Sequence, residues 1–169
     1  MDRVRLRPAA AADVPLLLTL IRGLAEYEHL QQEVVATESA LAHTLFGPIR
    51  YAEATIAEWD GEPAGFSLYF HNYSTFLARP GLYLEDLFVK PEYRGRGIGR
   101  QLLVDLARTA VERDCGRLEW AVLDWNEPAR RFYRSLGAVA KPEWLIKRLS
   151  GDALKQVAAM AAPPSDTAS

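Results

Sequence analysis

The sequence has few of the residues that form disulfides and metal centres. It contains one cysteine, Cys115, and three histidines among 169 residues. A single cysteine excludes an intrachain disulfide, and His29, His43 and His71 do not have a metal-ligand spacing. Cys115 has no histidine near it in the sequence, which disfavours a covalent cysteine mechanism. We therefore expect no metal, and the lack of disulfides fits the reducing cytoplasm.

Long apolar runs and an excess of one charge are also missing. The net charge is -2 at pH 7, so nothing attracts the chain generally to nucleic acid or anionic lipid. The leucine run at residues 16–18 is far too short to span a membrane, and no stretch of signal-peptide length follows Met1. We expect no nucleic-acid partner and no membrane association. The length and composition predict one globular domain, residues 1–160, with a disordered tail at 161–169.

The hydrophobic spacing predicts a fold in which strands and helices are mixed. Asp60-Gly61 suits a hairpin turn, and Thr37 and Asn126 suit helix N-caps. Hairpins and crossovers both occur, which predicts an α/β fold with a mixed sheet in the order strand, two helices, three strands, helix, strand, helix, strand. The predicted strands are residues 4–6, 52–59, 64–70, 82–89, 118–123 and 144–149, and the predicted helices are residues 11–28, 37–45, 98–111 and 128–136.

A glycine-rich stretch, Arg94-Gly95-Arg96-Gly97-Ile98-Gly99, lies between a predicted strand and a predicted helix. Glycines at alternate positions let the backbone turn tightly and gather N–H groups at a helix start, where an anion binds well. The Gly-Lys-Ser/Thr of a Walker A loop is absent, and Arg100 stands where a dinucleotide fingerprint needs its third glycine. The turn therefore indicates a phosphate site of another kind, although ordinary turns also use glycine.

Several segments resemble the GNAT N-acetyltransferase superfamily, and within it the spermidine/spermine branch, which includes diamine and thialysine enzymes. Arg94, Gly97 and Gly99 match the coenzyme A motif Arg-x-x-Gly-x-Gly of that superfamily. The resemblance implies the GNAT fold, acetyl-CoA as cosubstrate, a small-molecule amine as substrate and a homodimer. The other similar segments are Leu24-Ala25-Glu26-Tyr27-Glu28, Tyr83-Leu84-Glu85-Asp86-Leu87-Phe88-Val89, Tyr93-Arg94-Gly95, Trp125-Asn126-Glu127-Pro128 and Phe132-Tyr133.

The same resemblance implies which residues contact acetyl-CoA. A backbone N–H of residues 87–89 would face the thioester carbonyl and stabilise the oxyanion. Tyr133 would protonate the departing thiolate, since a phenol titrates near pKa ~10 and a thiol near ~8.5. Outside the motif Tyr133 would be an ordinary packing aromatic. The implied cofactor-binding residues are Leu87, Phe88, Val89, Arg94, Gly95, Arg96, Gly97, Ile98, Gly99, Arg100, Asn126, Pro128 and Ala129.

Acidic residues are the candidates for the amine site. Glu85 and Asp86 are adjacent on a predicted strand, so their side chains should point to opposite faces. By resemblance Glu85 lies at the substrate site, where it would bind a cationic amine or take its proton. Glu26, Tyr27 and Glu28 end the first helix, where acidic groups oppose the helix dipole but would attract a cation. Each could also be an exposed charge without a role.

The sequence thus predicts direct transfer of an acetyl group to a primary amine in a ternary complex. Two other functions stay open at this point. The acceptor could be a protein lysine or N-terminus, or the chain could be a non-catalytic acyl-CoA-binding module. The loop after Gly137, through Lys141 to Trp144, is short compared with the animal polyamine enzymes, so the identity of the amine is not determined.

Overall fold

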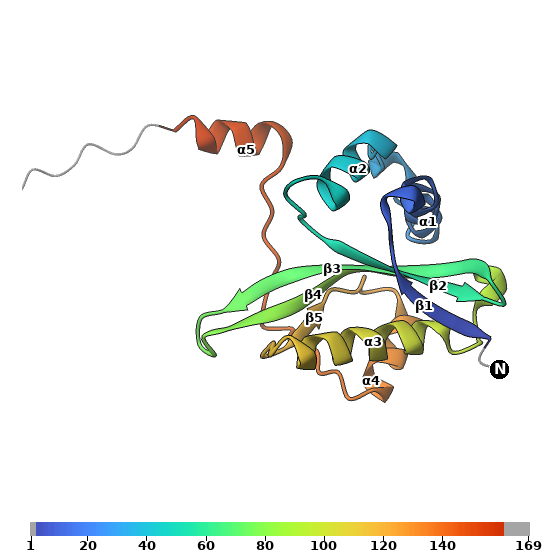
Figure 1. Ribbon diagram of the computed structural model, residues 1–169. Helices are drawn as coiled ribbons and strands as arrows, with labels where there is room; N and C mark the ends of the chain where they lie inside the picture. The colour runs from blue at the N-terminus through green and yellow to red at the C-terminus, as the bar shows by residue number, and fades with distance from the viewer. Residues whose placement is uncertain (1–2, 161–169) are drawn as a thin grey trace, which may run out of the picture. The chain divides into compact units, whose positions relative to one another are not determined.

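The computed structural model describes residues 3–160, which form two compact units, one up to Leu123 and one from Asp124. The first unit is a five-stranded sheet in the order β1-β2-β3-β4-β5, with helices on both faces (Figure 1). Its elements are β1 Val4–Pro8, η1 Ala11–Asp13, α1 Val14–Tyr27, η2 Gln31–Glu33, α2 Glu38–Phe46, β2 Glu53–Trp59, β3 Glu62–Ser74, β4 Arg79–Val89, η3 Pro91–Tyr93, α3 Ile98–Glu112 and β5 Leu118–Trp120.

The sheet is mixed, as predicted. The pairs β1–β2, β2–β3 and β3–β4 are antiparallel. The pair β4–β5 is parallel, and the crossover helix α3 connects these two strands. The helices α1 and α2 lie on one face and α3 on the other (Figure 1). One buried cluster joins the first two helices to the sheet, and a second joins α3 to it. The α3 residues predicted to be buried, Leu102, Leu103, Leu106 and Ala110, are all at most 5% exposed.

Two local predictions are confirmed by hydrogen bonds and backbone angles. The hydroxyl of Thr37 accepts a hydrogen bond from the Ala40 N–H at 3.1 Å and so caps α2. Asp60 and Gly61 have φ values of 50° and 88°, the left-handed conformation that a two-residue hairpin turn requires. The β2–β3 hairpin therefore forms where the sequence places it.

The second unit contains α4 Glu127–Ser135 and α5 Gly151–Ala158. The predicted final strand at residues 144–149 is wrong, because the segment has no strand hydrogen bonding within the described residues. Trp144 and Ile146 are 75% and 72% exposed. Their apolar character suits a strand, but a strand also needs a neighbour to pair with. Helix α5 was not predicted, and the predicted tail at 161–169 lies outside the described residues.

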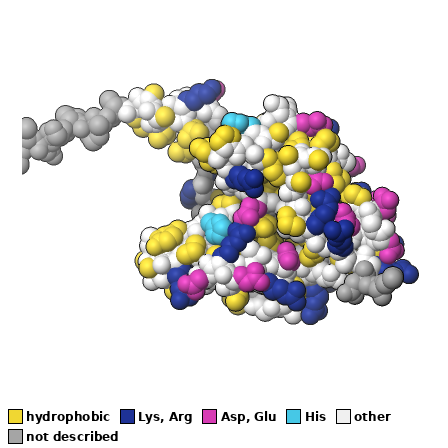
Figure 2. Space-filling view, in the orientation of Figure 1, with side chains coloured by type: hydrophobic (Ala, Val, Ile, Leu, Met, Phe, Trp, Pro, Cys, Tyr) yellow, Lys and Arg dark blue, Asp and Glu magenta, His cyan; other side chains and the backbone are white. Residues whose placement is uncertain are grey.

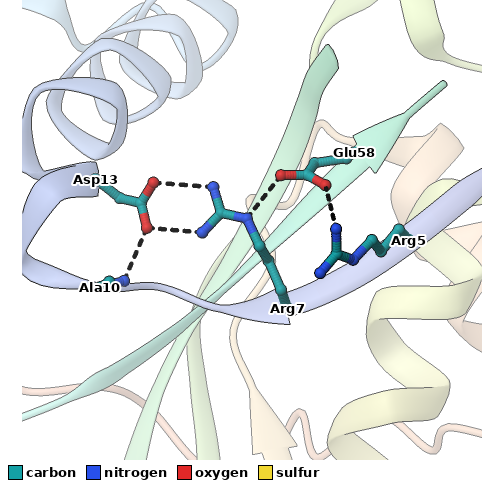
Figure 3. Close-up of polar contacts among 5 residues, drawn as sticks. All are labelled: Arg5, Arg7, Ala10, Asp13 and Glu58. Carbon is teal, nitrogen blue, oxygen red and sulfur yellow. Dashed lines mark hydrogen bonds and ion pairs between the residues drawn. The ribbon is translucent and has the colours of Figure 1, made fainter. Parts of the chain in front are cut away.

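An ion-pair network ties the first strand to the rest of the first unit (Figure 3). The Arg7 guanidinium donates to both carboxylate oxygens of Asp13 at 2.7 and 2.9 Å, and its Nε donates to Glu58 at 2.6 Å. Asp13 also accepts from the Ala10 N–H at 2.8 Å. The guanidinium lowers the pKa of the Asp13 carboxyl. Arg7 thus joins β1, β2 and the start of the α1 segment.

We expect Arg7→Ala to destabilise the fold by about 1–3 kcal/mol, because two largely buried carboxylates lose their partner. Arg5→Ala is the matched control. Arg5 is on the same strand and approaches Glu58 only at 4.0 Å with an exposed side chain, so its loss should cost less than about 0.5 kcal/mol. Urea unfolding of both variants measures the difference. Equal effects would show that the network contributes no more than an exposed ion pair.

Candidate acetyl-coenzyme A and amine site

A β-bulge in β4 organises the centre of the first unit. Asp86 pairs with Leu68 of β3 and Leu84 pairs with Tyr69, which leaves Glu85 as an extra residue between them. A bulge changes which side of the strand its later peptide groups face. The Leu82 N–H donates toward β5, to the Arg117 carbonyl at 2.9 Å. Beyond the bulge, the peptide groups of even-numbered residues face β3 instead. The Lys90 N–H shows this, because it donates to the Ala64 carbonyl at 2.9 Å.

Directly before the bulge, the edge of β4 beside β5 becomes unpaired. The parallel pairing of the two strands covers only Leu82–Leu84 of β4. Past that point the alternation turns the peptide groups of Leu87 and Val89 away from β3, toward the side that β5 has left. An extended chain with amide groups could hydrogen-bond to this edge as an added strand does. The Val89 carbonyl already accepts from the Nε of Arg94 at 2.9 Å.

The glycine turn, residues 94–99, lies directly after this edge and leads into α3. Gly95 and Gly97 have φ values of 75° and 79°, and an added Cβ at either would meet nothing within 4 Å. Backbone conformation, and not space, therefore demands glycine at both positions. Gly97 is the N-cap of α3 and no side chain caps the helix. The first α3 N–H groups precede the first intrahelical bond, so they are available to an anion.

The arginines of the turn differ in their surroundings. Arg94 stacks on the ring of Tyr27, with 4.4 Å from its guanidinium carbon to the ring centroid, and lies 5.8 Å from that of Phe88. Arg96 stacks on Trp59. Arg100 is exposed in the first turn of α3. Arg94 therefore braces the turn against β4 and the end of α1, and all three add positive charge around the helix start.

Carboxylates gather next to this positive turn. Asp86 lies on the sheet face that α1 covers, since its pairing partner Leu68 packs in the α1–α2 cluster. Burial, together with the nearby carboxylates of Glu85 and Glu28, raises the pKa of Asp86 to about 6. Burial also raises the pKa of Glu28. The structure thus brings together three acidic residues from two predicted segments.

The other predicted amine-site residues, Glu85, Tyr27 and Glu26, differ in their surroundings. Glu85 is exposed and Asp86 is half-buried, and the bulge interrupts the regular alternation from which their opposite directions are predicted, so that these directions stay a prediction. Tyr27 lies under the Arg94 guanidinium, so it links the acidic cluster to the glycine turn. Glu26 lines a cleft of about 530 Å³ that also includes Gly23, Phe88 and Lys90. Glu26 therefore shares its cleft with a cation.

The predicted residues after Leu123 belong to the second unit and are described within it. The Asn126 side chain accepts from the Ala129 N–H at 3.3 Å, which confirms it as the N-cap of α4. Pro128 occupies the first turn, where a missing N–H costs nothing. Tyr133 is half-buried in α4, and its ring centroid lies 5.3 Å from that of Phe132. The helix ends at Ser135, and Gly137, two residues further on, has a φ of 88°.

Two properties of the described residues bear on other functions. No group of three or more His, Cys, Asp or Glu side chains in residues 3–160 could hold a metal ion. Within the same residues, none of the helices has the length and apolar character needed to cross a membrane. Figure 2 shows acidic and basic side chains interspersed over the visible face, without a large patch of one sign.

The fold and the site define the class of protein: a mixed sheet that opens beside a bulged strand, next to a glycine turn that starts a helix. The sequence profile of the Acetyltransferase (GNAT) family matches residues 23–138. The chain therefore belongs to the GNAT family of acetyltransferases, which use acetyl-CoA. The matched region spans both units and includes every candidate residue named above.

Several individual proteins are similar to this chain over most of its length. A thialysine N-epsilon-acetyltransferase of Bos taurus is 40% identical, and the alignment covers 94% of this chain and 99% of that protein. An L-ornithine N5-acetyltransferase of Arabidopsis thaliana is 34% identical over 90% of this chain and 87% of its own length. Among solved structures, an integron cassette protein of V. cholerae superposes with a TM-score of 0.80 at 27% identity, covering 95% of this chain and all of the other.

The site also contains residues that the sequence did not indicate. Trp59, at the end of β2, and Arg3, before β1, contact each other near the glycine turn, with 5.7 Å from the guanidinium carbon to the ring centroid. They are more than 30 residues from the turn in sequence and belong to no recognised motif. Only the pairing of β1 and β2 and the packing of α3 bring them there.

The glycine geometry predicts a contrast between two alanine substitutions. Gly97→Ala should destabilise the fold by about 1–2 kcal/mol, because alanine is strained at a positive φ. Gly99→Ala should be neutral or slightly stabilising, since its Cβ would make ordinary contacts of 3.7 and 3.8 Å with Leu87 and Val89. Chemical denaturation of both variants tests this. A Gly99→Ala loss as large as that of Gly97→Ala would contradict it.

The raised pKa of Asp86 predicts a pH-dependent stability. The folded state holds the Asp86 proton up to about pH 6, whereas the unfolded chain releases it near the ordinary aspartate pKa of 3.8. Stability from this group is therefore present at low pH and is lost as the pH rises from about 4 to about 6. Asp86→Asn should raise the Tm more at pH 7.5 than at pH 4.5. If the Tm difference between Asp86→Asn and the wild type were the same at both pH values, the pKa of Asp86 would not be raised by folding.

Proposed function

We propose that this enzyme transfers the acetyl group of acetyl-CoA to a primary amine of a small cationic molecule, a diamine, polyamine or amino acid with a side-chain amine. The observation that supports the proposal is that a positively charged turn and a cluster of acidic residues lie next to each other within the first unit. The glycine turn offers cationic side chains and free helix N–H groups to an anion. The cluster of Glu28, Glu85 and Asp86, linked to the turn through Tyr27 and Arg94, offers negative charge to a cation.

The residues present fit acetyl-CoA as the cosubstrate. The pyrophosphate would be held by the N–H groups that follow Gly97 and by the arginines of the turn. The peptide groups of Leu87 and Val89 would pair with the pantetheine arm, and the adjoining Phe88 is part of the same strand edge. When bound, acetyl-CoA supplies the activated thioester. We propose that Asn126, Pro128 and Ala129, at the capped start of α4, complete the coenzyme site.

The acidic cluster would prepare the amine for attack. Asp86 and Glu28 hold the ammonium group by charge, and Glu85, being exposed, takes the amine proton directly or through a water molecule. A backbone N–H of residues 87–89 then stabilises the negative charge that develops on the carbonyl oxygen. Tyr133 donates a proton to the leaving thiolate. Transfer is direct, with both substrates bound at once.

The relatives support this substrate class. The names of the aligned enzymes specify thialysine and L-ornithine as acceptors, and a further relative, at 30% identity, is a spermidine/spermine N(1)-acetyltransferase-like protein of Homo sapiens. All of these acceptors are aliphatic amines with additional charge. We further propose that residues 1–160 act as one catalytic domain, and that the enzyme works as a homodimer in the cytoplasm.

An amine panel tests the proposal. The purified protein is mixed with acetyl-CoA and, separately, thialysine, ornithine, spermidine, spermine and a lysine peptide, and released thiol is measured. We expect release with at least one small amine and little with the peptide. Preference for the peptide would favour protein acetylation, and tight coenzyme binding with no release for any amine would favour a binding module.

The Tyr133→Phe variant tests the proposed acid with the best amine of that panel. We expect kcat to fall about tenfold or more while coenzyme affinity stays within about twofold, because only the proton donor is lost. Phe132→Leu is the matched control on the same helix and should leave kcat nearly unchanged. Equal losses of kcat and coenzyme affinity in Tyr133→Phe would assign the tyrosine a structural role instead.

A further inference from the structure

The ring of Trp59 contacts two guanidinium groups that come from distant segments of the chain. Its ring centroid lies 4.8 Å from the guanidinium carbon of Arg96 and 5.7 Å from that of Arg3. Trp59 ends β2, and its ring packs against the buried cluster that contains Ile98 and Leu102 of α3. The indole is therefore fixed by the core on one side while it contacts the glycine turn on the other.

The Arg96 guanidinium is held in place by more than this ring. It lies 5.5 Å from the ring centroid of Tyr93, and its Nη2 donates to the Glu92 carbonyl at 3.1 Å. A guanidinium has five N–H donors, so most of them stay available to a ligand. An exposed arginine otherwise loses substantial rotamer entropy when a ligand immobilises it. Here the aromatic platform has already restricted the side chain.

We propose that Trp59 is a positioning residue for the coenzyme: it holds the Arg96 guanidinium at the rim of the glycine turn before the coenzyme binds. This inference rests on the proposed function, because it assigns Arg96 an anionic ligand. Preorganisation strengthens binding by removing an ordering cost from the binding step. The second guanidinium on the same ring, that of Arg3, adds positive charge to this rim and should favour a polyanion such as coenzyme A.

Binding of free coenzyme A, measured by titration calorimetry, tests the inference without requiring turnover. We expect Arg96→Gln to weaken binding about tenfold, as for the loss of one charge-assisted contact. Trp59→Leu should weaken it about threefold, in line with one exposed cation–π contact. The double variant should bind no more than about twofold more weakly than Arg96→Gln alone, because Trp59 acts only through Arg96.

Two controls separate positioning from a general loss of structure. Trp59→Phe keeps an aromatic face and should restore binding to within about twofold of the wild type. In steady-state assays Trp59→Leu should raise the KM for acetyl-CoA and leave both kcat and the KM for the amine unchanged. A general loss of folding would instead reduce the active fraction and lower the apparent kcat.

Three results would overturn the inference. Unchanged or tighter coenzyme binding in Trp59→Leu would mean that the ring does not present Arg96, or holds it away from the ligand. Additive losses in the double variant would mean that Trp59 acts independently of Arg96. Failure of Trp59→Phe to restore binding would exclude the aromatic platform. Failure of the wild type to bind coenzyme A at all would instead refute the proposed function.

Discussion

The extra residue at Glu85 determines how the rest of the site is arranged. The pairing of β4 with β5 ends at Leu84, directly before the bulge, so the edge of β4 beyond this point is unpaired on that side. The bulge reverses the direction of the peptide groups that follow, so that Leu87 and Val89 face the side that β5 has left. It also leaves Asp86 paired with Leu68, on the face covered by α1. One inserted residue therefore determines which peptide groups face the unpaired edge and on which face of the sheet the Asp86 carboxylate lies.

The two substrates require opposite charges, and the fold keeps those charges on neighbouring elements. The end of β4 continues through η3 into the glycine turn, so the positive region follows the acidic residues by about ten positions in sequence. The aromatic rings of Tyr27, Phe88 and Trp59 contact and support Arg94 and Arg96. Aromatic faces attract guanidinium groups without neutralising them, which an acidic partner would do. The turn therefore keeps its positive charge while its arginines are held in position.

Local patterns predicted most of the elements because each depends on a short stretch of chain. Thr37 and Asn126 cap the helices that follow them, and Asp60-Gly61 forms the hairpin turn. The segment at 144–149 was misassigned as a strand because it is apolar, and apolar composition does not supply a pairing partner. The opposite orientation predicted for Glu85 and Asp86 depends on regular alternation along the strand, and no single-residue preference in the sequence indicates that a bulge interrupts this alternation.

By itself, the sequence determined the mixed α/β class, the glycine turn at a helix start and the family, because these depend on residue types at fixed local spacings. Tertiary structure alone decided the bulge at Glu85, the raised pKa of Asp86 and the stacking of Arg96 on Trp59. Each of these depends on strand register or on packing between segments far apart in the chain. Burial and cross-strand pairing are properties of the assembled fold, so no local pattern in the sequence carries them.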